Sequence, residues 1–283
     1  MGRSLAIRFA CALLLVACAT GRARAAESGT PFLSDRFGIS AGAYFANART
    51  DFQAGGAHAL GVMVSLERDL DLTEATDDAR FDGFYRINPR HAIDAGVVTI
   101  GRDGHRVTDR KIVFKDRVFE TNTDVHTKFD SRLFKLAYRY SFINDGRVET
   151  GIIAGVSTYS YELSLEGQAS LADTSGGGSS TELRSATENI IAPIPTIGIF
   201  TTCALRKNLI FRGTAEFFSV NVSSIEGRLI DGKILVDYFP TRRVGIGVGF
   251  AGTGMGLKYG TDTQKISVDY RYSGVLAMLD VML

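Results

Sequence analysis

Side chains alternate between apolar and polar along many segments of about 9 to 18 residues, and short polar turns separate these segments. Because successive side chains of a β-strand point to opposite faces, such alternation is typical of strands with one apolar and one polar face. Residues 133–142 show it most clearly, with Phe134, Leu136, Tyr138, Tyr140 and Phe142 on one face and Leu133, Lys135, Ala137, Arg139 and Ser141 on the other. Residues 80–87, 229–239, 244–250 and 266–272 repeat the pattern. The chain is therefore predicted to be all-β.

After residue 26 the sequence contains no run of about 18 apolar residues, the length that a membrane-spanning helix needs. A membrane protein without helices must be a closed barrel, since hydrocarbon offers backbone groups no hydrogen-bond partners. A soluble β-sandwich also alternates, but nothing selects aromatic residues at the ends of its strands. Here aromatics lie beside short polar turns at residues 88–91, 144–147, 206–208 and 240–243, and they form a predicted girdle of Tyr85, Tyr138, Tyr140, Phe142, Phe211 and Tyr238. We therefore predict a transmembrane antiparallel up-and-down β-barrel, with Tyr159 and Tyr161 at the opposite membrane interface.

The number of strands depends on the N-terminal third of the chain. Eleven strand starts can be recognised, near Phe37, Ala59, Arg80, Ala92, Phe129, Val148, Ile191, Leu209, Leu229, Val244 and Ile266. A barrel with both termini in the periplasm needs an even number, so 10–12 strands are expected. Residues 37–78 hold either one strand plus a tucked segment or three short strands, and we favour the second arrangement and twelve strands. Surface loops are expected at residues 102–128 and 167–189, and a bulge at Gly274.

The N-terminus is typical of an export signal. Arg3 and Arg8 precede an apolar stretch at residues 9–19, and Ala23-Arg24-Ala25 is a cleavage motif. Residues 1–25 are therefore predicted to be a signal peptide, cleaved between Ala25 and Ala26. Lipidation of Cys18, within a Leu-Val-Ala-Cys sequence, is an alternative processing route. Residues 26–35 would then form a short periplasmic segment and residues 36–283 the barrel domain.

Composition and motifs exclude several classes of function. The chain has 32 Lys+Arg and 31 Asp+Glu, a formal net charge of +1, so no nucleic-acid partner is expected. Its 4 histidines form no His-x-x-x-His pair, and no cysteine cluster exists, so we expect no metal and no cofactor. A lipid-modifying enzyme at the membrane edge would need a Ser-His pair, and Ser131 with the nearby His126 is the best candidate in this sequence. We nevertheless expect no enzyme activity and assign no catalytic residue.

Charged residues on the polar strand faces should line the barrel interior. The predicted lumen residues are Arg80, Asp82, Arg86, Lys135, Arg139, Glu149, Arg212, Glu216, Lys233, Asp237, Asp269 and Arg271. Both signs are present in similar numbers, whereas an ion-selective pore favours one sign at its constriction. Mixed charges at close quarters pair with one another, which favours a salt-bridged plug over a small polar conduit.

Five segments resemble a family of proteobacterial outer-membrane β-barrel proteins of mostly unassigned function: residues 37–44, 84–91, 137–142, 193–198 and 269–274. The resemblance spans nearly the whole mature chain and implies a barrel in the bacterial outer membrane, with no catalytic residues carried over. The terminal strand, with Val275, Ala277, Leu279, Val281 and Leu283 on one face, is similar to the strand that barrel assembly machinery recognises.

We expect a monomer in contact with outer-membrane lipid, acting as a structural protein or a narrow polar channel. A lipid-modifying enzyme is the first alternative. The second is a soluble or lipid-anchored barrel that binds an apolar ligand.

Overall fold

A computed structural model describes residues 30–54, 64–73, 75–107, 112–114, 117–119, 122, 124–171, 182–222, 225–260 and 265–283. The predicted signal peptide, its cleavage site at Ala25 and Ala26, and Cys18 lie outside these residues. Within the described chain, no helix is long and apolar enough to cross a membrane.

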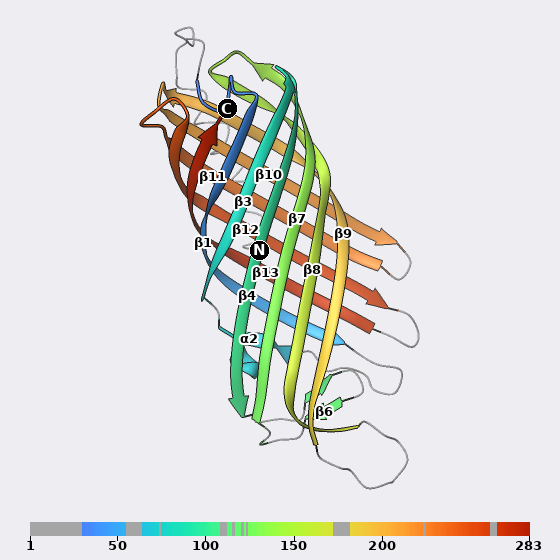
Figure 1. Ribbon diagram of the computed structural model, residues 1–283. Helices are drawn as coiled ribbons and strands as arrows, with labels where there is room; N and C mark the ends of the chain where they lie inside the picture. The colour runs from blue at the N-terminus through green and yellow to red at the C-terminus, as the bar shows by residue number, and fades with distance from the viewer. Residues whose placement is uncertain are drawn as a thin grey trace, which may run out of the picture.

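The described residues form a closed antiparallel barrel whose long strands follow one another in chain order (Figure 1). The ten long strands are β1 (Phe37–Ala54), β3 (Ala75–Asn88), β4 (His91–Val107), β7 (Asp124–Asn144), β8 (Val148–Leu171), β9 (Glu182–Arg206), β10 (Leu209–Val222), β11 (Ile225–Tyr238), β12 (Val244–Gly260) and β13 (Lys265–Met282). Closure comes from β1, which pairs with β13 from Gly38–Met282 to Ala54–Ile266. The sheet therefore has no free edge along these strands, as a membrane-spanning sheet requires.

The preference for twelve strands was wrong, because the described barrel has ten. Region 37–78 instead follows the other arrangement, one strand plus a tucked segment. After β1, residues 64–73 form the two-residue strand β2 (Val64–Ser65) and the short helix α2 (Leu66–Leu70). Leu66 and Leu70 are buried in the barrel's main hydrophobic cluster, so the apolar pattern of this segment fills the interior and adds no long strand to the wall.

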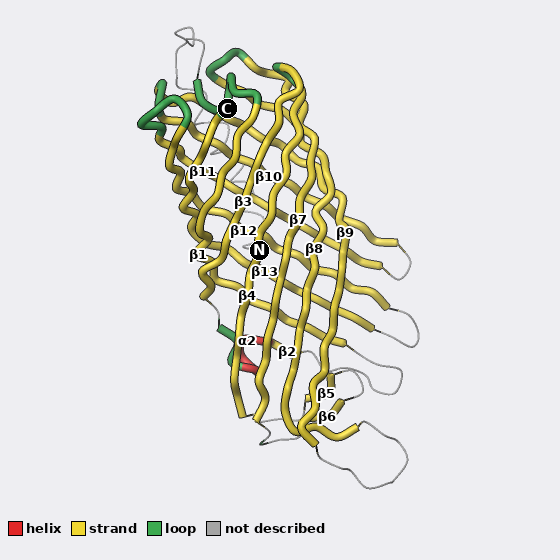
Figure 2. The backbone as a smooth tube through the Cα atoms, viewed as in Figure 1, coloured by secondary structure: helices red, strands yellow, loops and turns green. Residues whose placement is uncertain are grey.

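The four predicted short turns all lie at one end of the barrel, where the green connections gather in Figure 2. We call this the short-turn end and the opposite one the far end. The two expected surface loops are shorter than predicted, because strands continue through most of both regions. β4 and β7 reach Val107 and Asp124, with β5 (Ile112–Phe114) and β6 (Arg117–Phe119) between them. β8 and β9 extend to Leu171 and from Glu182.

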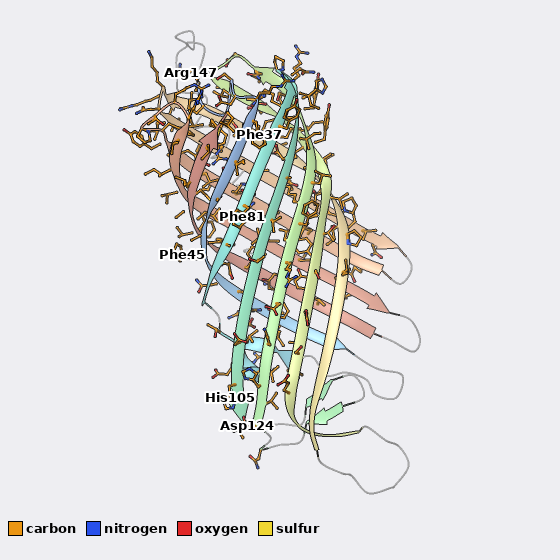
Figure 3. The ribbon with its side chains drawn as sticks, in the orientation of Figure 1. Phe37, Phe45, Phe81, His105, Asp124 and Arg147 are labelled. Carbon is orange, nitrogen blue, oxygen red and sulfur yellow. The ribbon has the colours of Figure 1, made fainter. Side chains whose placement is uncertain are left out.

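The outer face of the barrel is divided into two zones. Near the short-turn end it carries a continuous set of exposed apolar side chains, which we call the apolar belt: Ile39, Phe45, Phe81, Ile87, Ile93, Val97, Phe134, Leu136, Ile152, Val156, Ile197, Ile199, Ile234, Val236, Ile246, Val248, Phe250, Val275 and Leu279. Toward the far end the same outward positions become polar, with Asp103 and His105 on β4 and Asp124 and His126 on β7. Figure 3 shows Phe37, Phe45 and Phe81 nearer the short turns, and His105 and Asp124 at the far end. The strands are thus longer than the apolar belt, and their far ends project beyond it.

This zoning predicts that the cost of a charge depends on its position along one strand. Leu136 and His126 both point outward on β7, and Leu136 is 50% exposed. Leu136→Arg should destabilise the barrel in lipid bilayers by about 2–4 kcal/mol, because the belt faces hydrocarbon, whereas His126→Arg should have little effect. Equilibrium unfolding in denaturant from phospholipid vesicles measures both free energies. Equal costs at the two positions would contradict the placement of the belt.

Candidate functional site

The middle of the barrel interior is filled by charged side chains that face one another. Ten of the twelve predicted lumen residues point inward: Arg80, Asp82, Arg86, Lys135, Arg139, Glu149, Arg212, Glu216, Lys233 and Asp237. They share their strand faces with buried residues, so the alternation of the strands alone places them inside. The interior at this level is therefore polar.

Asp269 and Arg271 were assigned to the wrong face. Both side chains are well exposed on the outside of β13, where Arg271 Nη2 lies 2.9 Å from Asp269 Oδ1. The inward residues of this segment are Val268, Tyr270 and Tyr272, all buried. The prediction assumed that apolar residues face outward everywhere, but beyond the belt the apolar face of β13 turns to the interior.

The bulge expected at Gly274 is also absent, since β13 keeps one register with both neighbours from residue 266 to residue 281. Gly274 is needed for packing instead: a Cβ there would lie 1.9 Å from the carbonyl oxygen of Phe45.

Two ion pairs cross the lumen between strands that are not neighbours in the wall. Lys233 on β11 places its Nζ 2.7 Å from Asp82 Oδ2 on β3, and Arg80 Nε lies 2.9 Å from the same oxygen. Lys135 on β7 donates to Glu216 on β10, which also accepts from Thr196 Oγ1. Because the opposite walls touch through these pairs, the lumen is narrow at this level.

Three acidic residues of this interior, Asp94, Asp231 and Asp280, were missed from the sequence. Asp94 Oδ1 lies 2.9 Å from Arg139 Nε, and Asp280 accepts hydrogen bonds from Ser40 Oγ at 2.5 Å and Arg212 Nη2 at 3.3 Å. Arg212 also forms a two-point contact with Asp237, at 2.7 Å for each bond. Extending the alternation through β4, β11 and β13 would have found all three acids, since each shares its face with buried neighbours.

A segment of the chain closes the short-turn end. We call residues 30–36 the stopper. The Phe32 ring packs against Phe84 and Phe239, with centroids 5.9 and 5.6 Å away, and this cluster also contains Leu33, Ala204, Ile210 and Met282. Arg86 holds the stopper from inside, donating to the carbonyl oxygen of Phe32 at 2.8 Å and to that of Asp35 at 3.2 Å. The same guanidinium binds both carboxylate oxygens of Glu149, at 2.9 and 2.8 Å.

A second closure lies toward the far end. Its core is a buried aromatic cluster of Tyr44, Phe129, Tyr159, Tyr161, Tyr270 and Tyr272. Tyr159 and Tyr161 were expected at the membrane interface, but they point inward and are 1% and 3% exposed.

Helix α2 adds a buried ion pair to this second closure. Glu67 of α2 lies inside the barrel, where its Oε1 accepts from Arg102 Nη1 at 2.6 Å. Its other oxygen accepts from the backbone N–H of Thr50 at 2.9 Å. The tucked segment is therefore attached to β1 and β4 by one charged group.

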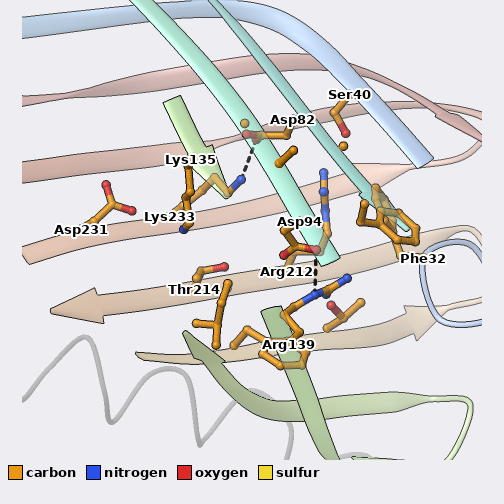
Figure 4. A pocket seen from close by; sticks show the side chains of 18 of the residues that line it. Phe32, Ser40, Asp82, Asp94, Lys135, Arg139, Arg212, Thr214, Asp231 and Lys233 are labelled. Atoms are coloured by element: carbon orange, nitrogen blue, oxygen red, sulfur yellow. Dashed lines mark hydrogen bonds and ion pairs between the residues drawn. The ribbon is translucent and has the colours of Figure 1, made fainter. Parts of the chain in front are cut away.

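A cavity of about 90 Å³ lies inside the barrel beside the stopper, with Phe32 among its lining residues (Figure 4). The side chains of Asp82, Lys135, Arg139, Arg212, Thr214 and Lys233 line it. This volume accommodates a few water molecules. No group of three or more His, Cys, Asp or Glu suited to a metal ion is found in the described parts of the chain.

The candidate enzyme pair does not form. Ser131 is buried on the inner face of β7, whereas His126 is exposed on the outer face of the same strand. His105 Nε2 lies 2.7 Å from Asp124 Oδ1 at the far end, but both side chains are more than 60% exposed. His91 packs at the short-turn end against Tyr138 and Tyr140.

The predicted girdle residues lie on the outer face of the barrel close to the short turns. Tyr85, Tyr138, Phe142 and Tyr238 are exposed there, and Tyr140 and Phe211 are half-buried. Their role as an interfacial girdle remains a prediction.

The contacts of Arg86 predict a large loss of stability when it is removed. Arg86→Ala leaves Glu149 buried without its cation and frees the stopper, so the free energy of unfolding should fall by about 3–5 kcal/mol. Arg132→Ala, on an exposed arginine of β7, is the matched control and should have a small effect. Denaturant titration of refolded protein in detergent measures both. Similar losses in the two variants would contradict the role given to Arg86.

No family model matches this sequence, and no curated protein matches it. Among solved structures, the outer membrane protease OmpT from Escherichia coli is similar in fold. It is 12% identical, with a TM-score of 0.54 over 87% of this chain and 97% of that one. The Ralstonia pickettii toluene transporter TbuX, 9% identical, gives a TM-score of 0.37 over 91% of this chain and 92% of its own. OprG from Pseudomonas aeruginosa, also 9% identical, gives 0.36 over 91% and 98%. In fold, the chain is therefore a closed antiparallel β-barrel similar to that of an outer-membrane protein.

Proposed function

We propose that this chain is a non-enzymatic outer-membrane barrel whose lumen is closed, and that its role is structural: to hold its far end outside the membrane. The proposal rests on three sets of residues that fill the barrel interior at different levels. The stopper, the cross-lumen ion pairs and the aromatic cluster with α2 occupy successive levels between the two ends.

Location in the outer membrane is supported by the distribution of side chains on the wall. The apolar belt exposes rings and branched aliphatic groups that a soluble protein would cover, while the charged residues at the same level lie inside. A soluble barrel that binds an apolar ligand needs the reverse arrangement. The partners proposed are therefore outer-membrane lipid and, through β13, the barrel assembly machinery. The protein is proposed to act as a monomer after export by its signal peptide.

A closed state is favoured over a conduit because opening it would expose unpaired charges. Moving Lys233 away from Asp82, or Lys135 away from Glu216, leaves poorly solvated charges without their counter-ions. The narrow polar channel nevertheless has one feature in its favour, the charged cavity in the middle of the barrel. For a conduit, both closures would have to move.

The lipid-modifying enzyme has no support from the geometry, because Ser131 and His126 face opposite sides of the wall. The protease OmpT shares the fold, and this likeness at 12% identity carries no activity to the present chain. The absence of enzyme activity is part of the proposal.

Conductance measurements test the closed lumen. Refolded protein inserted into planar bilayers at high salt should give no unit conductance steps, because two closures and the ion pairs block the path. A variant lacking residues 30–36 should also give none, since the aromatic cluster remains. Regular unit steps from the unaltered protein would reject the proposal in favour of the channel.

Chemical labelling reports on the stopper separately and shows that the protein under test is folded. Thr214 lines the cavity, so Thr214→Cys in a Cys203→Ala background places one thiol there. A small water-soluble thiol reagent should label it slowly in the intact barrel and much faster when residues 30–36 are deleted. Rapid labelling with the stopper present would contradict closure at the short-turn end.

A further inference from the structure

A groove of about 530 Å³ lies on the outer wall of the barrel, across β1, β13, β12 and β11. It shares no lining residue with the cavity inside the barrel. Asn47, Arg49, Ile230, Gly254, Arg271 and Ser273 are among the residues that line it. It begins where the apolar belt ends, so its position relative to the membrane is set by the strand register.

The register orders the groove into rows across neighbouring strands. Phe45, Val275 and Phe250 pair in one row of the apolar belt. The next outward-facing row contains Asn47, Ser273, Gly252 and Gly232, and the following one contains Arg49, Arg271, Gly254 and Ile230. Arg49 is four residues beyond Phe45, or about 13 Å along the strand, less in height because barrel strands are tilted. The two arginines therefore lie just outside the hydrocarbon, at the level of lipid headgroups.

The floor of the groove is made by glycines of β12. Gly252 and Gly254 line it from successive outward positions of β12, and a Cβ built on Gly254 meets nothing within 4 Å. No packing inside the protein requires a glycine at this position, in contrast to Gly274. The space left open on the wall is bounded by apolar side chains on the membrane side and by guanidinium groups above.

Arg49 and Arg271 are direct partners across β1 and β13, and like charges in that relation repel one another. Arg271 is partly compensated by Asp269, whereas Arg49 has no ion-pair partner among the described residues. A phosphate bound between two guanidinium groups would remove this repulsion through charge-assisted, bidentate hydrogen bonds. The row of Arg49 and Arg271 thus carries two positive charges that an anionic headgroup would complement, and the next outward row holds the carboxylates of Asp51 and Asp269.

We propose that this groove binds one phosphorylated lipid of the outer leaflet, with its phosphate on Arg49 and Arg271 and an acyl chain descending over Phe250 and Val275. The proposal rests on the membrane location proposed above, because the belt sets the depth of the arginines. It does not depend on whether the lumen is closed. The groove would make the protein selective for lipid that carries phosphate at this height.

The test measures binding of fluorescent lipid A, which carries two phosphates, to the full-length protein in non-ionic detergent. Arg49→Gln/Arg271→Gln should weaken binding at least about tenfold, as expected for the loss of charge-assisted hydrogen bonds. Arg132→Gln, at an exposed arginine outside the groove, should leave binding unchanged. Equal affinity of the double variant and the unaltered protein would overturn the proposal.

A variant that fills the groove tests the same proposal independently. Gly254→Val fits the strand without a clash and fills the groove, so it should also weaken binding while thermal stability is kept. Gly83→Val is the matched control, because Gly83 lies half-buried within the belt and a Cβ there meets only the carbonyl oxygen of Gly38 at 3.5 Å. Binding unaffected by Gly254→Val would remove the groove from the site.

Two competitors distinguish the source of the phosphate. Dephosphorylated lipid A should compete poorly, and inorganic phosphate should not compete at millimolar concentration, since it lacks the acyl chains. Effective competition by either one would overturn the lipid assignment. These outcomes are read in detergent, so they are separate from the bilayer measurements on Leu136→Arg that test the membrane location itself.

Discussion

A backbone that crosses hydrocarbon must satisfy every N–H and C=O group within the protein, and this constraint determines the rest of the structure. The ten long strands meet it by closing the sheet where β1 pairs with β13. Closure divides the side chains of each strand into an outer set that contacts lipid and an inner set that fills an enclosed space. The apolar belt and the ion-paired interior are the two results of that one division, and both come from the same period of two residues.

Along the barrel from the short-turn end, the outer side chains change from apolar to polar, whereas the inner side chains change from charged to aromatic. At the level of the belt, where the outside is apolar, the inside holds pairs such as Lys233–Asp82 and Lys135–Glu216. Beyond the belt the outside becomes charged and the inside becomes aromatic around Tyr161. In each zone one face of the strand is polar and the other apolar. The alternation therefore continues along the strand, but the apolar face is the outer one in the belt and the inner one beyond it. This reversal explains why the wall can continue past the membrane without losing its packing.

The same reversal sets the limit of what the sequence could predict. The all-β class and the inward direction of most of the interior charges follow from local alternation, because within the belt an apolar residue faces outward. Barrel closure follows from the lack of a membrane-spanning helix, and the four short turns from their polar residues. The assignment of Asp269 and Arg271 failed because that rule was applied beyond the belt, where Tyr270 and Tyr272 point inward. The strand count failed for a different reason. Residues 64–73 carry apolar residues that pack inside the barrel, and no local pattern distinguishes that from a short strand.

At the level of the belt, side chains along each strand face lipid and the enclosed interior in turn. The chain has no tryptophan, so one introduced tryptophan provides an unambiguous fluorescence signal. Phe81 points outward and Phe84 inward on the same strand, β3. In vesicles of lipids brominated on their acyl chains, Phe81→Trp should be strongly quenched and Phe84→Trp should not. Quenching of neither position, or of both equally, would contradict the account.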